Sequence, residues 1–455
     1  MIGNVSNDKG SALITAILIS LIITATVGIA LTAYSLHRRL IYGKVFFLQA
    51  KYLAESGIHH VLVNLQKNWE TESRKGYWRQ HISITAKDSV DVVRFPWGGY
   101  IHVEAVAQKK HQRYTLRTLV GEQPSSVFDY GVVINPAYYS LVVTGDTRLY
   151  CDVLVGKSGV KKETFRGRPY TGTQSVYGHI TKTREDRRPA VATNYIRFII
   201  AQFGEELNSV DTVPLEKIVS DTSATVSLNT EEGFRNVYVT NDLLNQRNWS
   251  IRGPGILIAD EPLTIHTKLR ITNYVKVLCS GPIIVEGGGS YEEVIFYSPK
   301  QIVLSGVPYF RGQLFSESGI RVKNHSRLHY PSIVLTYSND DTSTIQLLKG
   351  SEITGTVMYV TRNRLPIPST QRGKILIDEG AVVNGFVYSD NLVTLKGTVN
   401  GAVITDRFHF YYSPTDYYNW IKDGVVNRNK LTRYISLPLL FDLPKKHLRK
   451  VVLQP

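Results

Sequence analysis

The sequence predicts an α+β protein with a long N-terminal membrane-spanning helix, a small antiparallel sheet and a mainly β body. Residues 11–34 carry no charge, residues 100–120 alternate between apolar and polar in two runs, and a glycine-centred fragment recurs between residues 310 and 404. We expect the body to be an irregular β-solenoid, and an ordinary β-sandwich is the alternative.

The uncharged run from Ser11 to Tyr34 is long enough to cross a bilayer. A helix rises about 1.5 Å per residue, and the hydrocarbon core is roughly 30 Å thick. The apolar region of a cleaved secretory signal peptide has only about 7–15 residues. Here His37-Arg38-Arg39 and further apolar sequence follow the run. We therefore expect a single-pass anchor that signal peptidase does not remove.

The predicted helix continues beyond the membrane, because no proline interrupts residues 11–66. Its second half carries an apolar stripe, mostly at steps of three and four residues: Phe47, Ala50, Ala54, Ile58, Val61, Leu62 and Leu65. An amphipathic helix must pack against another element. Residues 100–107 and 114–120 alternate with period two around a polar turn, so we expect this hairpin to be the partner.

Two short motifs in this region lead to a family resemblance. Asp8-Lys9-Gly10-Ser11 looks like the end of a class III (prepilin) leader. Residues 49–58 resemble an A-x-x-x-A-E-[AS]-G stretch through Ala50, Ala54, Glu55 and Gly57. Together they resemble the N-terminal region of minor type IV pilins and type II secretion minor pseudopilins. The resemblance covers the first 65 residues or so and not the body.

The resemblance implies a processing and assembly pathway. A prepilin peptidase would cut between Gly10 and Ser11 and methylate the new N-terminus. The helix would then pack with other pilin or pseudopilin subunits in a filament core. Major pilins usually carry Glu at the fifth position after the cut, whereas this chain has Thr15. This departure favours a minor, priming or tip subunit over the bulk fibre subunit.

We expect the protein to lie in the bacterial cytoplasmic (inner) membrane, with the lipid bilayer around the helix and the body outside the cytoplasm. An extracellular filament is the second location. Arg38, Arg39 and Lys44 follow the span, and the positive-inside tendency alone would favour the opposite orientation. The expected regions are a leader at 1–10, a transmembrane and stalk helix at 11–67, a small pilin-like α/β region at 68–127, a β-rich body at 128–407 and a C-terminal cap at 408–455.

The body carries the recurring fragment of an apolar residue, a polar residue, Gly, any residue and two apolar residues. It occurs at 310–315, 353–358, 383–388 and 399–404, with a looser copy at 149–154. Such fragments are typical of solenoid coils, which we expect to turn at Gly or Asn. Residues 183–188 and 362–372 are expected loops, 190–207 has helical spacing, and 416–422 is an expected short capping helix.

We expect no catalytic, metal-binding or cofactor-binding residues. Glu292-Glu293 and Asp340-Asp341 are adjacent carboxylates, which on a strand point to opposite faces, so we interpret both as solvated turns. The net charge of +15 is scattered, without the motifs of nucleic-acid-binding proteins, so we expect no nucleic-acid partner. Cys151 and Cys279 either form a disulfide or remain two buried thiols.

The function predicted first is therefore structural: a membrane-anchored minor pilin-like subunit at or near a filament tip. The alternative is a signal-anchored β-solenoid protein that binds or cleaves cell-wall polysaccharide. A third hypothesis is an anchored scaffold that never enters a filament.

Overall fold

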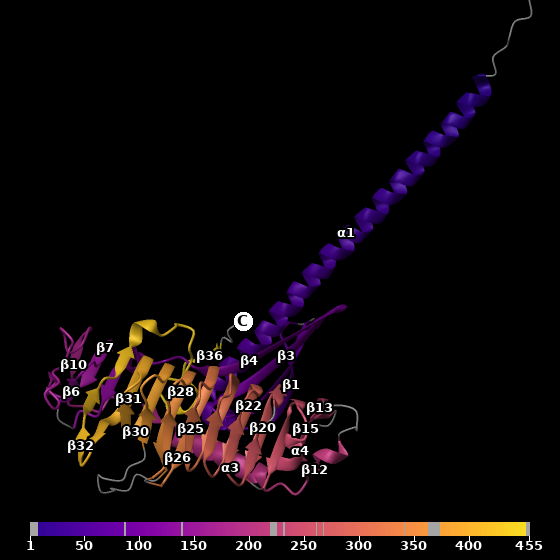
Figure 1. The fold of residues 1–455 in the computed structure, drawn as a ribbon. Helices are drawn as coiled ribbons and strands as arrows, with labels where there is room; N and C mark the ends of the chain where they lie inside the picture. The colour runs from indigo at the N-terminus through magenta and orange to yellow at the C-terminus, as the bar shows by residue number, and fades with distance from the viewer. Residues whose placement is uncertain are drawn as a thin grey trace, which may run out of the picture. The chain divides into compact units, whose positions relative to one another are not determined.

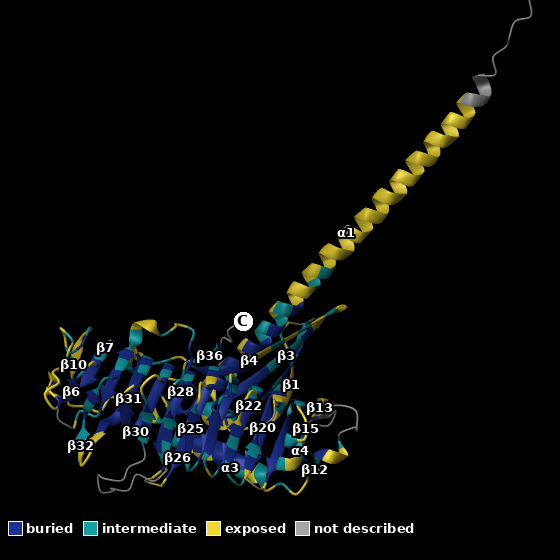
Figure 2. Cartoon of the chain, in the orientation of Figure 1, coloured by how far each residue is buried: buried dark blue, intermediate teal, exposed yellow. Residues whose placement is uncertain are grey.

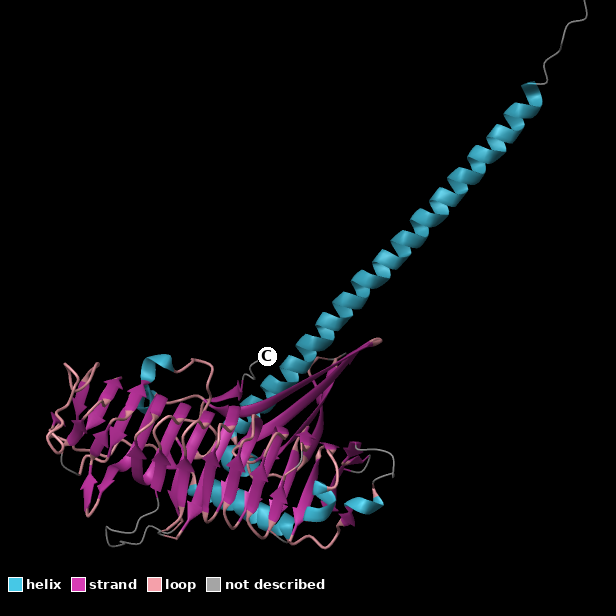
Figure 3. Cartoon of the chain, viewed as in Figure 1, coloured by secondary structure: helices cyan, strands magenta, loops and turns pink. Residues whose placement is uncertain are grey.

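A computed structural model of the chain describes residues 8–85, 88–137, 140–218, 225–230, 233–260, 262–266, 268–340, 342–362 and 374–451. The chain forms two compact units. The first consists of Met1–Lys67, Gly76–Phe95 and Val103–Thr118, and the second of Asn68–Lys75, Pro96–His102 and Leu119–Pro455. The predicted long apolar helix, small antiparallel sheet and mainly β body are all confirmed (Figures 1 and 3).

The long helix is α1 (Asp8–Lys67), and within it Ala12–Lys67 is long and apolar enough to cross a membrane. It is followed by four strands: β1 (Trp78–Ser83), β2 (Ser89–Trp97), β3 (Tyr100–Lys109) and β4 (Gln112–Glu122). These form one sheet in the order β1-β2-β3-β4-β36, and β1 is antiparallel to β2. The last strand, β36 (Leu448–Val451), pairs antiparallel with residues 119–122 of β4.

The strands of the body pair in parallel, mostly with a strand two or three places further along the chain, and form three rows. The longer strands bend at bulges and take part in more than one row. The first row contains β15 (Gly233–Tyr238), β17 (Gly255–Ala259), β20 (Val275–Cys279), β22 (Ser290–Ser298), β24 (Tyr309–Ser316), β26 (Arg327–Ser338), β28 (Glu352–Thr361), β30 (Val382–Leu395), β31 (Thr398–Tyr412), β5 (Val132–Ile134), β8 (Val153–Val155) and β10 (Ile180–Lys182).

The other two rows follow the same principle. The second contains β13 (Thr225–Ser227), β16 (Ser250–Arg252), β19 (Arg270–Thr272), the first residues of β22, β24, β26, β28, β30 and β31, and then β34 (Val425–Asn427) and β7 (Arg148–Tyr150). The third contains β18 (Leu263–Ile265), β21 (Ile283–Glu286), β23 (Ile302–Ser305), β25 (Gly319–Lys323), β27 (Thr344–Leu347), β29 (Lys374–Ile377) and the end of β30. A separate three-stranded sheet contains β33 (Trp420–Lys422), β6 (Leu141–Thr144) and β9 (Val160–Lys162).

Short elements complete the described part of the body. They are α2 (Trp69–Glu72), η1 (Ser126–Asp129), β11 (Ala190–Val191), β12 (Val213–Pro214), η2 (Leu215–Lys217), β14 (Asn229–Thr230), α4 (Asn241–Asn245), β32 (Thr415–Tyr418), η3 (Arg428–Lys430) and β35 (Phe441–Asp442).

One apolar core runs through the rows, because inward side chains of paired strands lie in register. In the first row Leu257, Val277, Phe296, Leu314, Val334, Val357, Val387, Val403, Val132 and Val153 follow one another. All of them belong to a single buried cluster. Paired strands are about 4.8 Å apart, so each side chain packs on the one from the preceding strand.

The order of strands in space departs from their order in the chain. Val132 of β5 is in register with Val403 of β31, so residues 132–182 extend the far end of the rows instead of beginning them. Figure 1 shows β6, β7 and β10 at the same end of the body as β31.

Helix α3 (Thr193–Leu207), predicted over 190–207, lies along the first row and contacts several of its strands. Arg197 Nε donates to Tyr337 Oη of β26 at 3.1 Å, the ring of Phe203 packs 5.1 Å from that of Tyr297 in β22, and Glu206 accepts from Lys276 of β20 at 2.5 Å.

The short helix expected at 416–422 is wrong. Residues of this segment form β32, antiparallel to the end of β31, and β33, parallel to β6. Its aromatic and β-branched residues favour strands once neighbouring strands offer backbone partners. In the second row Val426 of β34 pairs with Leu149 of β7, so strands from early in the chain continue the row beyond β34. Of the expected loop at 362–372, only Arg362 belongs to the described residues, whereas 183–188 is a loop as predicted.

The recurring glycines have a different reason from the one expected. Gly355, Gly385 and Gly401 lie in register inside β28, β30 and β31. A Cβ on Gly385 would lie 1.8 Å from the carbonyl oxygen of Gly355, and one on Gly401 would lie 1.8 Å from that of Gly385. The close approach of stacked backbones therefore requires glycine. Beside them Asn400 Nδ2 donates to Asn384 Oδ1 at 2.8 Å, which continues the register in side chains.

Candidate functional site

The N-terminal part of α1 is exposed and apolar. Every residue from Ala12 to Tyr42 is exposed, as Figure 2 shows by colour, and the large side chains among them include Leu13, Ile17 and Ile22. The hydroxyls of Thr24, Thr26 and Thr32 each donate to the carbonyl four residues earlier, at 2.7–2.8 Å. These polar groups are thereby satisfied within the helix, as an apolar environment requires.

The following part of α1 packs on the sheet of the first unit. Ala50 and Ala54 are fully buried, and Ile58, Val61 and Leu65 continue the predicted stripe. Small side chains let a helix and a sheet approach closely. Of the motif residues, Ala50, Ala54 and Gly57 are therefore packing positions.

Gly57 shows how closely the helix and β2 approach. A Cβ at this position would lie 2.8 Å from Cγ1 of Val90 and 3.2 Å from Cγ2 of Val92. Glu55, the remaining motif residue, is partly exposed and makes no hydrogen bond or ion pair among the described residues.

We expect Gly57→Leu to destabilise the packing of α1 on β2 by about 2 kcal/mol, because the added side chain overpacks the contact with Val90 and Val92. Hydrogen exchange of the β2 amides should become faster. Gly43→Ala on the same helix is the matched control, since a Cβ there has nothing within 4 Å. Equal exchange in the two variants would contradict the packing role of Gly57.

Aromatic and basic side chains lie close to one another where α1 extends beyond the sheet. The ring of Phe47 packs edge-on at 5.3 Å from that of Tyr114, and Lys110 Nζ lies 4.6 Å from the ring centre of Phe46. Earlier in α1, the guanidinium group of Arg38 lies 5.3 Å from the ring centre of Tyr42. Aromatic and basic side chains of this kind are typical of the boundary between a membrane and water.

The predicted processing positions, Gly10 and Ser11, belong by their backbone to the first turns of α1. Their side chains and residues 1–7 of the predicted leader lie outside what the structure describes. Cleavage after Gly10 stays a prediction.

Cys151 and Cys279 are buried thiols, and no disulfide joins them in the described part of the chain. Burial raises the pKa of Cys151 to about 12 and also raises the pKa of Cys279, so both are protonated at neutral pH. The strands β22, β24, β26, β28, β30, β31 and β5 separate β20 from β8 in the first row. A disulfide needs Cα atoms within about 7 Å, so this fold does not bring the two cysteines together.

The interpretation of Glu292 and Glu293 as a solvated turn with opposed side chains is wrong. Both belong to β22, and the register shifts between Glu292 and Val294. Glu293 has a φ of 54°, as expected at a bulge. The bulge turns both carboxylates toward Arg311, which pairs with Glu292 and lies 3.9 Å from Glu293. Of the second pair, Asp341 lies outside the described residues.

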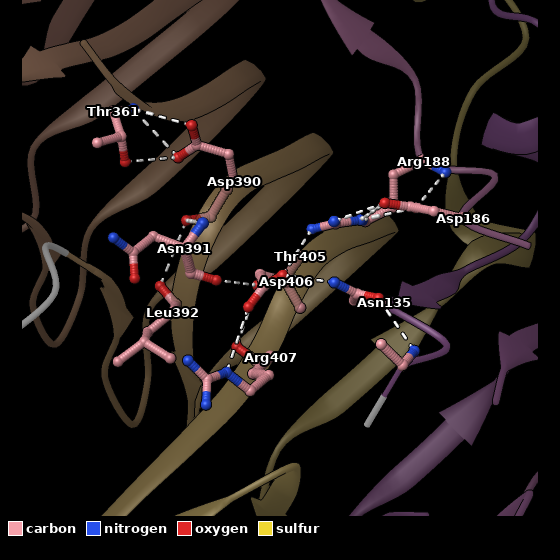
Figure 4. Close-up of polar contacts among 12 residues, drawn as sticks. Asn135, Asp186, Arg188, Thr361, Asp390, Asn391, Leu392, Thr405, Asp406 and Arg407 are labelled. Carbon is pink, nitrogen blue, oxygen red and sulfur yellow. Dashed lines mark hydrogen bonds and ion pairs between the residues drawn. The ribbon is translucent and has the colours of Figure 1, made fainter. Parts of the chain in front are cut away.

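A buried polar junction in the second unit escaped the sequence reasoning (Figure 4). Asp406 accepts from Asn135 at 2.8 Å and from Arg188 and Arg407 at 3.2 Å each, and its side chain is only 8% exposed. Burial opposes the charge of Arg188, but the carboxylates of Asp186 and Asp406 outweigh it and raise its pKa. Asn135 and Arg188 lie more than 200 positions before Asp406 in the sequence, so no local pattern could have found these two contacts.

A second junction joins the end of β4 to the C-terminal segment. Glu122 is fully buried, accepts from Lys446 Nζ at 3.1 Å, and exchanges two backbone hydrogen bonds with Leu437 at 2.8 Å. Burial raises the pKa of Glu122 to about 7, although Lys446 acts in the opposite direction.

This raised pKa predicts a pH dependence. Between its usual value near 4.5 and about 7, folded Glu122 retains a proton that the unfolded chain has lost. Stability should therefore fall by about 3 kcal/mol as pH rises through this window. Denaturant unfolding of wild type and Glu122→Gln at pH 4.5, 6 and 8 checks this, because the glutamine variant should lack this slope. Parallel curves for the two proteins would contradict the assignment.

Among the described residues, no group of three or more His, Cys, Asp or Glu side chains is placed to hold a metal ion.

Comparisons with known proteins add little to this site. No protein-family model matches the chain, and no curated protein matches it. Among solved structures, the chain is similar to the crystal structure of the competence-associated pilin ComZ from Thermus thermophilus, with 8% identity over 89% of this chain and 98% of that chain. The TM-score is 0.20, which is too low to support an inference.

Proposed function

We propose that the chain is a membrane-anchored, minor pilin-like or pseudopilin-like structural subunit. One observation carries this proposal: a single unbroken helix has an exposed apolar N-terminal part and a second part that buries Ala50 and Ala54 and packs Gly57 against β2. The exposed part needs an apolar cover, which lipid supplies before assembly and neighbouring subunit helices supply in a filament. The leader-like Gly10-Ser11 sequence and the Ala50–Gly57 motif support the same function.

The finer steps follow from this role. A prepilin peptidase cuts after Gly10 and methylates Ser11, and Thr15 in place of Glu suits a subunit at or near the tip. Before assembly the protein is a single-pass protein of the inner membrane with its body outside the cytoplasm. Arg38, Tyr42 and Lys110 then lie at the level of the lipid headgroups.

We also propose that the body is a β-solenoid. Parallel strands in three rows, inward side chains in register and the Gly355–Gly385–Gly401 stack support it. A β-sandwich would instead pair mostly antiparallel strands in two sheets. In this proposal the solenoid is the part of the subunit presented to the surroundings.

Mass spectrometry of the membrane-purified protein tests the processing. In cells with an active prepilin peptidase, wild type should begin with methylated Ser11. Gly10→Val should retain Met1, and Gly3→Val in the same leader should be processed like wild type. Full-length wild-type protein that retains Met1 in such cells would overturn the proposal.

The alternative, a signal-anchored protein that binds or cleaves polysaccharide, draws on one observation. The bulge in β22 brings Glu292 and Glu293 to one side, where both face Arg311. If this cluster acts on glycans, Glu292→Gln should abolish binding or hydrolysis of cell-wall polysaccharide while the N-terminus remains uncut. A scaffold that never enters a filament would be absent from sheared filament fractions.

A further inference from the structure

The far end of the body, formed by residues 157–187, is strongly basic. This segment contains eight Lys and Arg residues and three Asp and Glu residues, so it carries +5 of the net charge of +15. Most of its residues are exposed. Lys157, Lys161, Lys182 and Arg184 have no ion-pair partner among the described residues. This end therefore presents uncompensated positive charge.

The same end presents an open strand edge. In the sheet β33-β6-β9, strand β9 is the outer strand, and among the described residues it pairs with β6 alone. Leu141 N donates to Gly159 O at 3.0 Å, and Glu163 N donates to Val143 O at 3.2 Å, so residues 159 and 163 face β6. Because facing alternates along a parallel strand, the backbone groups of Val160 and Lys162 face away from β6.

The cations lie on and beside this edge. Lys161 and Lys162 belong to β9 and are exposed. A Cβ at Gly159 would lie 2.9 Å from Cε of Lys182, which places the Lys182 side chain next to the start of β9. Ile180 of β10 is 39% exposed, so the same end also offers an apolar contact.

We propose that this end binds an acidic, extended segment of a partner protein, which adds to β9 as a further strand. An open edge supplies backbone hydrogen bonds, and the lysines select a negatively charged strand. A second copy of this chain would bring like charges to the same edge, so self-pairing is disfavoured. The inference is independent of the membrane anchor and of leader processing.

Fluorescence anisotropy with the detergent-solubilised full-length protein tests the proposal. The probe is an eight-residue peptide of alternating Val and Glu, and the comparison peptides are its Val-Lys counterpart and an acidic peptide in which every Val is replaced by Pro. We expect binding of the Val-Glu peptide alone. Affinity should fall at least tenfold in Lys161→Glu/Lys162→Glu/Lys182→Glu.

Three further variants separate charge from strand pairing. Lys217→Glu/Lys268→Glu/Lys349→Glu makes the same change of charge at exposed positions elsewhere and should bind like wild type. Lys162→Gln and Lys162→Pro both remove one charge, but only proline also removes the outward N–H. Proline should therefore weaken binding several-fold more than glutamine, with unchanged circular dichroism in both.

Three results would overturn the proposal. The first is no binding of the Val-Glu peptide. The second is equal binding of the proline-containing acidic peptide, polyglutamate, duplex DNA or anionic vesicles, which would make the surface a general anion-binding patch. The third is an equal loss of affinity in the Lys217, Lys268 and Lys349 control.

Discussion

Replacing Gly385 with alanine is expected to destabilise the body by about 4 kcal/mol or more, one of the largest effects available to a single methyl group. The added Cβ would lie 1.8 Å from the carbonyl oxygen of Gly355 and 2.9 Å from its carbonyl carbon. The obstacle is backbone, so no side chain can move to relieve it. The φ of 153° adds strain for any residue with a Cβ.

Purification yield and denaturant unfolding measure this effect. Gly288→Ala is the control in the same body, because its nearest neighbour is a side-chain atom of Lys268 at 3.9 Å. It should unfold like wild type. A Gly385→Ala protein with wild-type stability would show that the strands are not stacked in this register.

Asp406→Ala is expected to cost about 3 kcal/mol, because it leaves Arg188 and Arg407 without a carboxylate that both contact. The side chains of these arginines are only 15% and 10% exposed. The loss would loosen the junction where β5, the segment before α3 and β31 meet. Denaturant unfolding and limited proteolysis near residue 188 report the effect.

Asp186→Ala is the matched control for this junction. Asp186 also pairs with Arg188, but its side chain is 46% exposed, so its removal should cost about 1 kcal/mol or less. Adding Arg188→Met to Asp406→Ala should recover part of the lost stability, since it removes a mostly buried charge that Asp406 no longer helps to balance. If the double variant were less stable than Asp406→Ala, charge burial would not be the cause.

Local patterns in the sequence were enough for several features. The packed stripe of α1 follows from the spacing of Ala50, Ala54, Ile58 and Leu65, because helical periodicity places these residues on one face whatever they pack against. The helix at 193–207 follows from the same kind of spacing. The glycine-centred fragments were found in the sequence, and their register in β28, β30 and β31 agrees with the repeat.

Other features depend on contacts between distant segments. Residues 416–422 form strands instead of the expected helix, because β31 and β6 offer backbone partners that the local sequence does not reveal. The side chains of Glu292 and Glu293 both face Arg311 because a bulge interrupts the strand's alternation of side-chain direction. The prediction that they point to opposite faces assumed an uninterrupted strand. Asp406 contacts Asn135 and Arg188, and Glu122 contacts Lys446, across more than 200 residues of sequence.

The amino-acid sequence by itself was sufficient for an N-terminal helix that is apolar around its whole circumference up to Tyr34 and amphipathic from Tyr42 onward. The spacing of hydrophobic residues is a property of neighbouring residues, so the faces of a helix can be predicted without knowing the tertiary structure. Only the tertiary structure decided the position of residues 132–182 in space. Their strands come after β31 in the rows, instead of before β15 as their place in the sequence would suggest. Strand order depends on which strands pair and bury their apolar side chains together. The free energy of that burial comes from contacts between segments that are far apart in the sequence.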